Sequence, residues 1–137
     1  MFKITDTCSG CHYCVSWCPV KAIHGRKKQR HSIDDTCISC GSCGRICGFQ
    51  AVVDHQDVIQ RRIQLSQWPK PVWNYEFCDS CEACVRACPV GCIRMVGEPS
   101  QPGAMLLPKL ITPKRCIACG FCGKACDKKA ITMRVVQ

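Results

Sequence analysis

The chain has 137 residues, 17 of them cysteine, and a formal net charge of +9 at pH 7. An odd number of cysteines excludes a disulfide framework that uses every thiol. No apolar run approaches the roughly 18 residues that a membrane helix needs, and the first cysteine comes too early to leave room for a secretory signal peptide. We therefore expect reduced, metal-binding cysteines in a cytoplasmic protein without membrane insertion.

The first half of the chain is expected to contain short strands around two cysteine runs. Alternating apolar and polar residues predict a strand at residues 2–5, before the first run. Further strands are predicted at 20–23, at 31–34 and, after the second run, at 51–54. The pattern of loop, short helix and strand thus occurs twice in this half.

The basic run at residues 26–31 lies between two of these predicted strands. It is read as a solvated hairpin tip, with a docking patch for an acidic protein surface as the alternative. The run has no aromatic platform and no recognisable nucleic-acid motif, so we do not expect nucleic acid as a partner.

Residues 56–71 contain no cysteine and are predicted to link two domains, 1–55 and 72–137. The apolar residues at 58–65 allow a short helix or a packed extended segment, and two prolines disfavour helix at the exit. Trp68 and Trp73 are expected to pack between the halves, with a partner-facing aromatic anchor as the alternative.

The second half is expected to repeat the loop, short helix and strand of the first half. A strand is predicted at 72–77 before the third cysteine run, followed by a strand at 92–96. Turn-forming residues then predict an insertion at about 97–108, which is either a surface loop or an element that grips a partner. Strands at 109–112 and 130–136 flank the fourth run.

Four cysteine runs share one spacing, with gaps of two, two and three residues between successive thiols. The four runs begin at Cys8, Cys37, Cys78 and Cys116. A single CxxC pair is weak evidence, but four unbroken copies in one short chain are highly specific. Proline follows the last thiol of the first and third runs, at Pro19 and Pro89.

These runs resemble those of bacterial ferredoxins with two 4Fe-4S clusters, in which the fourth cysteine ligates the other cluster of the pair. Each half resembles one such ferredoxin, so the resemblance implies an α+β chain of two tandem ferredoxin-like domains. It also implies four 4Fe-4S clusters as cofactors.

The ligand sets follow from that resemblance by exchanging the fourth cysteine between the two runs of each half. Cluster one is assigned to Cys8, Cys11, Cys14 and Cys47, and cluster two to Cys37, Cys40, Cys43 and Cys18. Cluster three is assigned to Cys78, Cys81, Cys84 and Cys126, and cluster four to Cys116, Cys119, Cys122 and Cys88. The remaining thiol, Cys92, is expected to pack beside a cluster. The four histidines show no ligand spacing and are expected at the surface or in hydrogen bonds.

The resemblance implies transfer of single electrons, without a catalytic site in this chain. Its expected partners are a redox donor or acceptor protein and a larger oxidoreductase subunit, as in tungsten or molybdenum enzymes such as aldehyde oxidoreductase and formate dehydrogenase. Self-association into a longer relay is a further expectation. Four oxidised clusters would add a charge of about −8, so the loaded protein would be nearly neutral.

Two alternatives to a permanent subunit remain at this point. A free ferredoxin shuttle would use the same clusters while diffusing between enzymes. A zinc-binding interaction module would use the same sixteen thiols in closed tetrahedral sites, although zinc ribbons usually pair CxxC knuckles over longer gaps.

Overall fold

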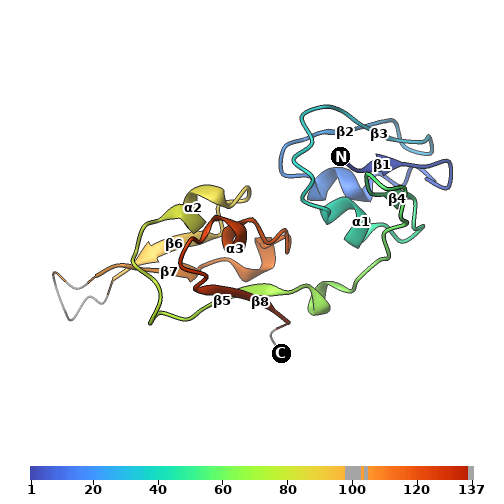
Figure 1. Cartoon of the computed structure of the whole chain (residues 1–137). Coiled ribbons are helices and arrows are strands. Elements are labelled where there is room, and N and C mark those ends of the chain that lie inside the picture. The colour runs from blue at the N-terminus through green and yellow to red at the C-terminus, as the bar shows by residue number, and fades with distance from the viewer. Residues whose placement is uncertain (98–102, 104, 136–137) are drawn as a thin grey trace. The chain divides into compact units, whose positions relative to one another are not determined.

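The computed structural model describes residues 1–97, 103 and 105–135. They form two compact units, Met1–Trp68 and Pro69–Gln137, shown in Figure 1. Each unit combines short antiparallel strand pairs with short helical turns, as expected of a small α+β protein. In the described part of the chain, no helix has the length or apolar character needed to cross a membrane.

The first unit has two strand pairs. Strand β1 (Lys3–Ile4) pairs with β4 (Val52–Val53), and β2 (Ile23–His24) pairs with β3 (Ser32–Ile33). Two five-residue turns lie between the pairs, the 3-10 turn η1 (Tyr13–Trp17) and helix α1 (Ser42–Ile46). A further 3-10 turn, η2 (Leu65–Gln67), closes the unit.

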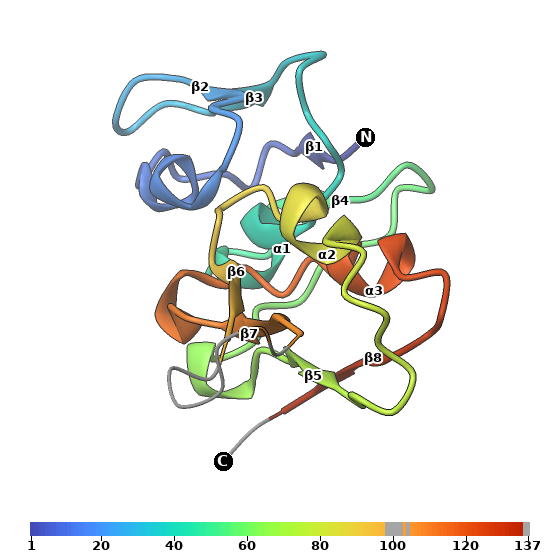
Figure 2. The same ribbon diagram turned by 90° about the vertical axis from the view of Figure 1, so that its left-hand side faces the viewer.

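The second unit repeats this arrangement with longer strands. Strand β5 (Lys70–Trp73) pairs with β8 (Ile131–Arg134), and β6 (Ile93–Val96) pairs with β7 (Leu107–Leu110). Helices α2 (Ala83–Ala87) and α3 (Phe121–Ala125) pack side by side, as both views show (Figures 1 and 2). The 3-10 turn η3 (Pro113–Arg115) leads into the fourth cysteine run.

The core of each unit is made jointly of aliphatic side chains and cysteines. In the first unit Cys43 is buried with Ile4, Ile23 and Val52. In the second unit the buried cluster consists of Ile93 and four cysteines, which are Cys84, Cys92, Cys116 and Cys122. Burial of apolar area therefore places these five thiols inside the fold, whereas Cys11 and Cys81 are exposed.

Three predicted strands are shifted in the structure. The strand predicted at 20–23 is β2, which begins only at Ile23 because Lys21 lies after a turn with a positive φ of 55°. The strand predicted at 72–77 is β5, which ends at Trp73 because a turn follows, with the Phe77 N–H donating to the Asn74 carbonyl at 3.1 Å. The strand predicted at 109–112 is β7, which begins at Leu107. Pro108 is accommodated because β7 belongs to a two-stranded ribbon, where a missing N–H can face outward. Residues 98–102 and 104 of the predicted insertion lie outside the described residues.

The predicted linker is bonded to the first unit over part of its length. The Gln60 N–H donates to the Val52 carbonyl at 2.8 Å, and the Ile63 N–H donates to the Arg45 carbonyl at 2.9 Å. Trp68 is 1% exposed and packs edge-to-face on Trp17 with ring centroids 5.1 Å apart. Trp73 packs against the core of the second unit. Each ring therefore packs on side chains of its own unit, Trp68 fully and Trp73 partly buried, whereas we expected both to pack between the halves.

A hairpin lies over the first cysteine loop of each unit at equivalent positions. In the first unit the Lys28 N–H donates to the Gly10 carbonyl at 2.8 Å. In the second unit the Ser80 hydroxyl donates to the Leu106 carbonyl. Gly10 and Ser80 occupy the same position between the first two cysteines of their runs, so both hairpins are fixed to a cysteine loop.

Replacement of Gly10 should destabilise the first unit. Gly10 has φ +74°, and an added Cβ would lie 2.3 Å from the Gln29 backbone nitrogen. We expect Gly10→Ala to cost about 1–2 kcal/mol for the left-handed conformation, with the clash adding to it. Gly91→Ala is the matched control, because Gly91 also has a positive φ (+64°) but nothing within 4 Å of its added Cβ. Gly10→Ala should therefore unfold faster on heating than Gly91→Ala, followed by near-UV circular dichroism on metal-loaded protein; equal rates would contradict the close approach.

Candidate metal centres

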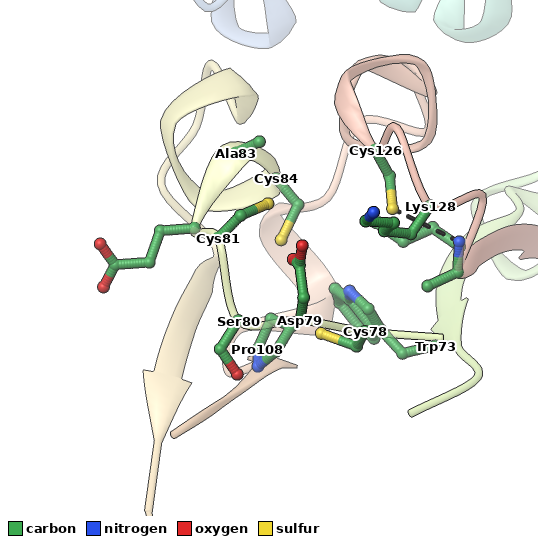
Figure 3. Close-up of a pocket in the computed structure, with 13 residues that line it drawn as sticks. Trp73, Cys78, Asp79, Ser80, Cys81, Ala83, Cys84, Pro108, Cys126 and Lys128 are labelled. Atoms are coloured by element: carbon green, nitrogen blue, oxygen red, sulfur yellow. Dashed lines mark hydrogen bonds between the residues drawn. The ribbon is translucent and has the colours of Figure 1, made fainter. Parts of the chain in front are cut away.

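Three cysteines of one run and the fourth cysteine of its partner run line a single hollow in the second unit. The thiols of Cys78, Cys81 and Cys84 face this hollow together with Cys126 from the end of α3 (Figure 3). Trp73, Pro108 and Lys128 also line it. The structure thus brings together residues that lie 48 positions apart in the sequence, between 78 and 126.

The first unit has two hollows of the same kind. One is lined by Cys8, Cys11, Cys14 and Cys47. The other is lined by Cys37, Cys40, Cys43 and Cys18. In both, three thiols come from one loop and the fourth comes from the other run of the unit.

The remaining four cysteines are connected through Cys92. The sulfur of Cys92 lies 3.5 Å from that of Cys88, and a side-chain hydrogen bond connects Cys92 with Cys116. Cys122 interacts electrostatically with Cys116 and Cys119. Cys88, at the end of α2, therefore reaches the thiols of the fourth run.

A repeated backbone pattern separates the fourth thiol of each run from the other three. In all four runs a residue with positive φ precedes a five-residue helical turn, and the third cysteine is the second residue of that turn. The fourth cysteine follows the turn in extended conformation, with ψ between 104° and 114°. The extended residue leaves the helical path, so its thiol points away from the loop that holds the first three.

Backbone N–H groups point at several of these sulfurs. The N–H of the residue four positions after the fourth cysteine donates to its sulfur in three runs: Ala22 to Cys18 at 3.2 Å, Ala51 to Cys47 at 3.5 Å, and Ala130 to Cys126 at 3.3 Å. The last of these bonds is the dashed line at Cys126 in Figure 3. The N–H of Gly10 donates to Cys8, and the N–H of Ser39 donates to Cys37, both at 3.4 Å. Such donors favour the thiolate, which is the form that binds metal.

Burial opposes ionisation of the central thiols. It is the main cause that raises the pKa of Cys14 to about 11, with smaller contributions from the neighbouring Cys47, Cys8 and Cys11. Burial likewise raises the pKa of Cys43 and of Cys122 to about 12. Four clustered thiols in an apolar shell therefore need a cationic core to hold them as thiolates. This donor set fits a 4Fe-4S cluster, whose four irons each take one thiolate.

The thiols surround hollows and do not converge on a point. Within residues 1–97, 103 and 105–135, no three His, Cys, Asp or Glu side chains come close enough to hold a single metal ion. A cluster places each thiolate on a different iron, so its ligands are spread around a volume.

Two side chains at these sites make polar contacts that the sequence did not predict. The indole nitrogen of Trp73 is buried and, in the described part of the chain, has no hydrogen bond of ordinary geometry. Burial raises the pKa of Cys84, and interaction with this indole N–H partly offsets the effect. Cys92 is 1% exposed, as expected of a thiol packed beside a cluster, but it also contacts another thiol directly. A periodicity pattern carries neither the direction of an indole N–H nor a contact between sulfurs.

Two of the histidines, His12 and His31, form a hydrogen-bonded pair. The His31 Nδ1–H donates to the Gln29 carbonyl at 2.9 Å, so its Nε2 accepts from the His12 Nδ1–H at 2.8 Å. His31 is 1% exposed. This chain of bonds joins the basic hairpin to the first cysteine loop and agrees with a hydrogen-bonding role.

Comparison with known proteins identifies the class of these sites. Three models of the 4Fe-4S dicluster domain match the chain, over residues 1–48, 36–93 and 77–130. A ferredoxin from Alicyclobacillus acidocaldarius is 37% identical over 59 residues, which are 42% of this chain and 76% of that protein. An uncharacterized ferredoxin from Methanocaldococcus jannaschii is 26% identical over an alignment of 133 residues, which covers 93% of this chain and 74% of that protein.

Among solved structures, one chain of a formate dehydrogenase–heterodisulfide reductase–formylmethanofuran dehydrogenase complex from Methanospirillum hungatei aligns with 96% of this chain and 54% of its own length. The sequence identity is 22% and the TM-score is 0.37. This chain thus spans about half the length of that subunit.

Removal of Cys92 should leave every cluster in place. Three runs have alanine at the equivalent position, at Ala22, Ala51 and Ala130, so Cys92→Ala makes the fourth site like the others. We expect iron and sulfide contents equal to those of the wild-type protein, measured after anaerobic purification. Cys88→Ala is the matched comparison and should lose one cluster's worth of iron. A loss of the same size from Cys92→Ala would mean that Cys92, too, is a ligand.

Proposed function

The chain belongs to the ferredoxin family, and from that premise we propose that it relays single electrons through four 4Fe-4S clusters as the iron–sulfur subunit of a larger oxidoreductase. Ferredoxins are electron-transfer iron–sulfur proteins. The observation that carries the proposal is that three hollows are each lined by three thiols of one run and the fourth thiol of its partner.

We assign the four ligand sets with exchange of the fourth cysteine in each unit. Cysteines 8, 11, 14 and 47 hold cluster one, and cysteines 37, 40, 43 and 18 hold cluster two. Cysteines 78, 81, 84 and 126 hold cluster three, and cysteines 116, 119, 122 and 88 hold cluster four. The lining of the three hollows supports the first three sets, and the contacts of Cys92 with Cys88 and Cys116 support the fourth.

When bound, each cluster takes up and releases one electron with little movement of its ligands. The chain's own residues supply the rest. Aliphatic side chains such as Ile4, Ile23 and Val52 exclude water from the thiols of the first unit. Backbone N–H groups donate to the ligand sulfurs and so stabilise negative charge on them. In this proposal the chain transfers electrons, and its partner carries the site at which the substrate reacts.

Two features favour a permanent subunit over a free shuttle. The chain carries two units in tandem. Its formal charge of +9 nearly cancels the charge of about −8 that four oxidised clusters would add, whereas shuttles of this family are commonly acidic. By resemblance the larger partner is a tungsten or molybdenum oxidoreductase, with a second redox protein as donor or acceptor.

Anaerobic purification tests the proposed function. We expect a brown protein in which dithionite reduction gives electron paramagnetic resonance signals that integrate to four reduced clusters. Zinc in place of iron, or iron and sulfide for fewer than four clusters, would contradict the proposal. In native extract the subunit should migrate with a larger iron-containing oxidoreductase; migration at its own mass would favour a free shuttle.

Paired substitutions test the exchange of the fourth cysteine. Cys18→Ala alone should remove one cluster's worth of iron. Combining it with Cys37→Ala should remove no more, because both residues hold cluster two, whereas combining it with Cys8→Ala should remove two clusters. This non-additivity identifies residues that act on one centre. The opposite pattern of iron loss would mean that each run keeps its own four thiols on one cluster.

A further inference from the structure

Exposed cations and exposed aromatic rings lie beside the hollow of cluster one in the first unit. We call this surface the cluster-one rim; it consists of Tyr13, Phe49, Arg26, Lys27 and Lys28. We propose that the cluster-one rim is the docking surface for a redox protein with an acidic surface, which exchanges single electrons with cluster one in a transient complex. This inference rests on the proposed function and deepens it, because the ligand sets alone do not say where a second redox protein binds.

The basic run at residues 26–31 is fixed beside cluster one. It connects the two strands of the β2–β3 hairpin (Figure 1). The Lys28 N–H donates to the Gly10 carbonyl, between the first two cysteines of the first run, at 2.8 Å. The buried His31 ring bonds to His12 at 2.8 Å, and both rings line the hollow of cluster one. Backbone and side-chain bonds therefore hold the cations of this run next to the first cysteine loop.

Three cations of the run are available to a partner. Arg26, Lys27 and Lys28 are exposed, and none of them forms an ion pair within the residues that the structure describes. Arg30, in contrast, is paired with Asp6. Exposed cations without neighbouring carboxylates attract an acidic protein surface and speed its association. The charge of the cluster-one rim thus favours an acidic partner.

Two aromatic rings of the cluster-one rim give that partner an apolar contact. Tyr13 and Phe49 both line the hollow of cluster one, and they are 50% and 52% exposed. Cys11, which lines the same hollow, is itself exposed, so the ligands of cluster one reach the surface here. Aromatic side chains and arginine are enriched in protein interfaces, where exposed rings act as anchors.

The equivalent surface of the second unit has a different character. Ala83 occupies the position of Tyr13 in its cysteine run, and Lys128 lies where the first unit has its second ring. Two exposed carboxylates, Asp79 and Glu82, also line the hollow of cluster three, and Figure 3 shows Asp79 there. An acidic protein is therefore favoured at cluster one and repelled by these carboxylates at cluster three.

The composition of the cluster-one rim fits a transient protein complex. Permanent subunit interfaces are large and apolar, and charged residues are depleted at their centres. Here exposed cations surround a small aromatic contact, which suits a small interface that forms by charge attraction and dissociates quickly. Three cations are few for a nucleic acid, whose binding draws on many phosphate contacts.

Electron transfer to two cytochromes of opposite charge tests the proposal. The probes are a b-type cytochrome of net negative charge and a c-type cytochrome of net positive charge, both in the ferric form. One electron passes from the fully loaded protein, reduced with dithionite and then freed of it, to the haem iron, which becomes ferrous; no bond forms or breaks. Stopped-flow absorbance of the haem gives the second-order rate constant. For the acidic probe this constant should fall steeply with added salt, because salt screens the attraction.

Charge reversal in the basic run should slow the reaction with the acidic probe. We expect Arg26→Glu combined with Lys27→Glu to lower that rate constant about tenfold at low salt and to leave the reaction with the basic probe no slower. Arg94→Glu combined with Lys109→Glu is the matched control, because these exposed cross-strand neighbours lie in the second unit and the net charge changes equally. Equal slowing by both double variants would overturn the proposal, since net charge alone would then explain it.

Removal of a ring separates docking from general attraction. Phe49→Ala should lower the rate constant for the acidic probe several-fold, and this effect should persist at about 1 M salt, where charges are screened beyond roughly 3 Å. Phe77→Ala is the control, because Phe77 is 58% exposed but lies beside the third cysteine run. Equal rate constants for Phe49→Ala and the wild-type protein would contradict the aromatic contact. The charge variants lie outside the cysteine runs and still test the proposal if Phe49→Ala loses iron.

Two further measurements keep the possible failures apart. Iron and sulfide analysis comes first, because a wild-type protein without four clusters would fail the proposed function. A fully loaded protein that reduces both cytochromes with the same salt dependence would overturn only the docking surface. Retention of single-stranded RNA at physiological salt by the wild-type protein, and its loss with Arg26→Glu and Lys27→Glu, would also overturn the proposal, since the run would then bind nucleic acid.

Discussion

Burial of thiols from two separate runs around one hollow is the constraint on which the rest of this structure depends. Each helical turn has only five residues, too few to be stable alone, and each strand pair of the first unit has two residues per strand. The elements hold together because the third cysteine of a run packs in the core of its unit, fully buried in three runs and partly buried at Cys14, and the fourth reaches across to the partner run. The apolar residues mainly form a shell around these thiols.

The two units repeat this arrangement, and some of the side chains in which they differ lie beside the thiols. Both have the positive-φ residue before the helical turn, the extended fourth cysteine and a hairpin bonded to the first loop. They differ at Ile4 and Trp73 and at Ala22 and Cys92, which change the polarity of the surroundings of the clusters and leave the backbone bonds unchanged. The backbone is thus repeated, and the side chains beside the thiols are what distinguish one candidate site from another.

Much of this arrangement could be predicted from the sequence because cysteine spacing fixes local geometry. The short strands around each run and their closing partners are found close to the predicted positions. The packing of Trp68 was not predictable, since its partner Trp17 is 51 positions away within a cysteine run. The early start of β7 was missed because Pro108 normally argues against a strand. The donors at Trp73 and Cys92 depend on side-chain directions, which composition and periodicity do not carry.

The extended fourth cysteine also has a consequence for how the chain matures. In the proposed ligand sets, Cys14 shares a cluster with Cys47 and Cys84 shares one with Cys126. No cluster can therefore be fully ligated until both runs of its unit have been synthesised. Loss of one cluster, by contrast, leaves the other with its own four thiols.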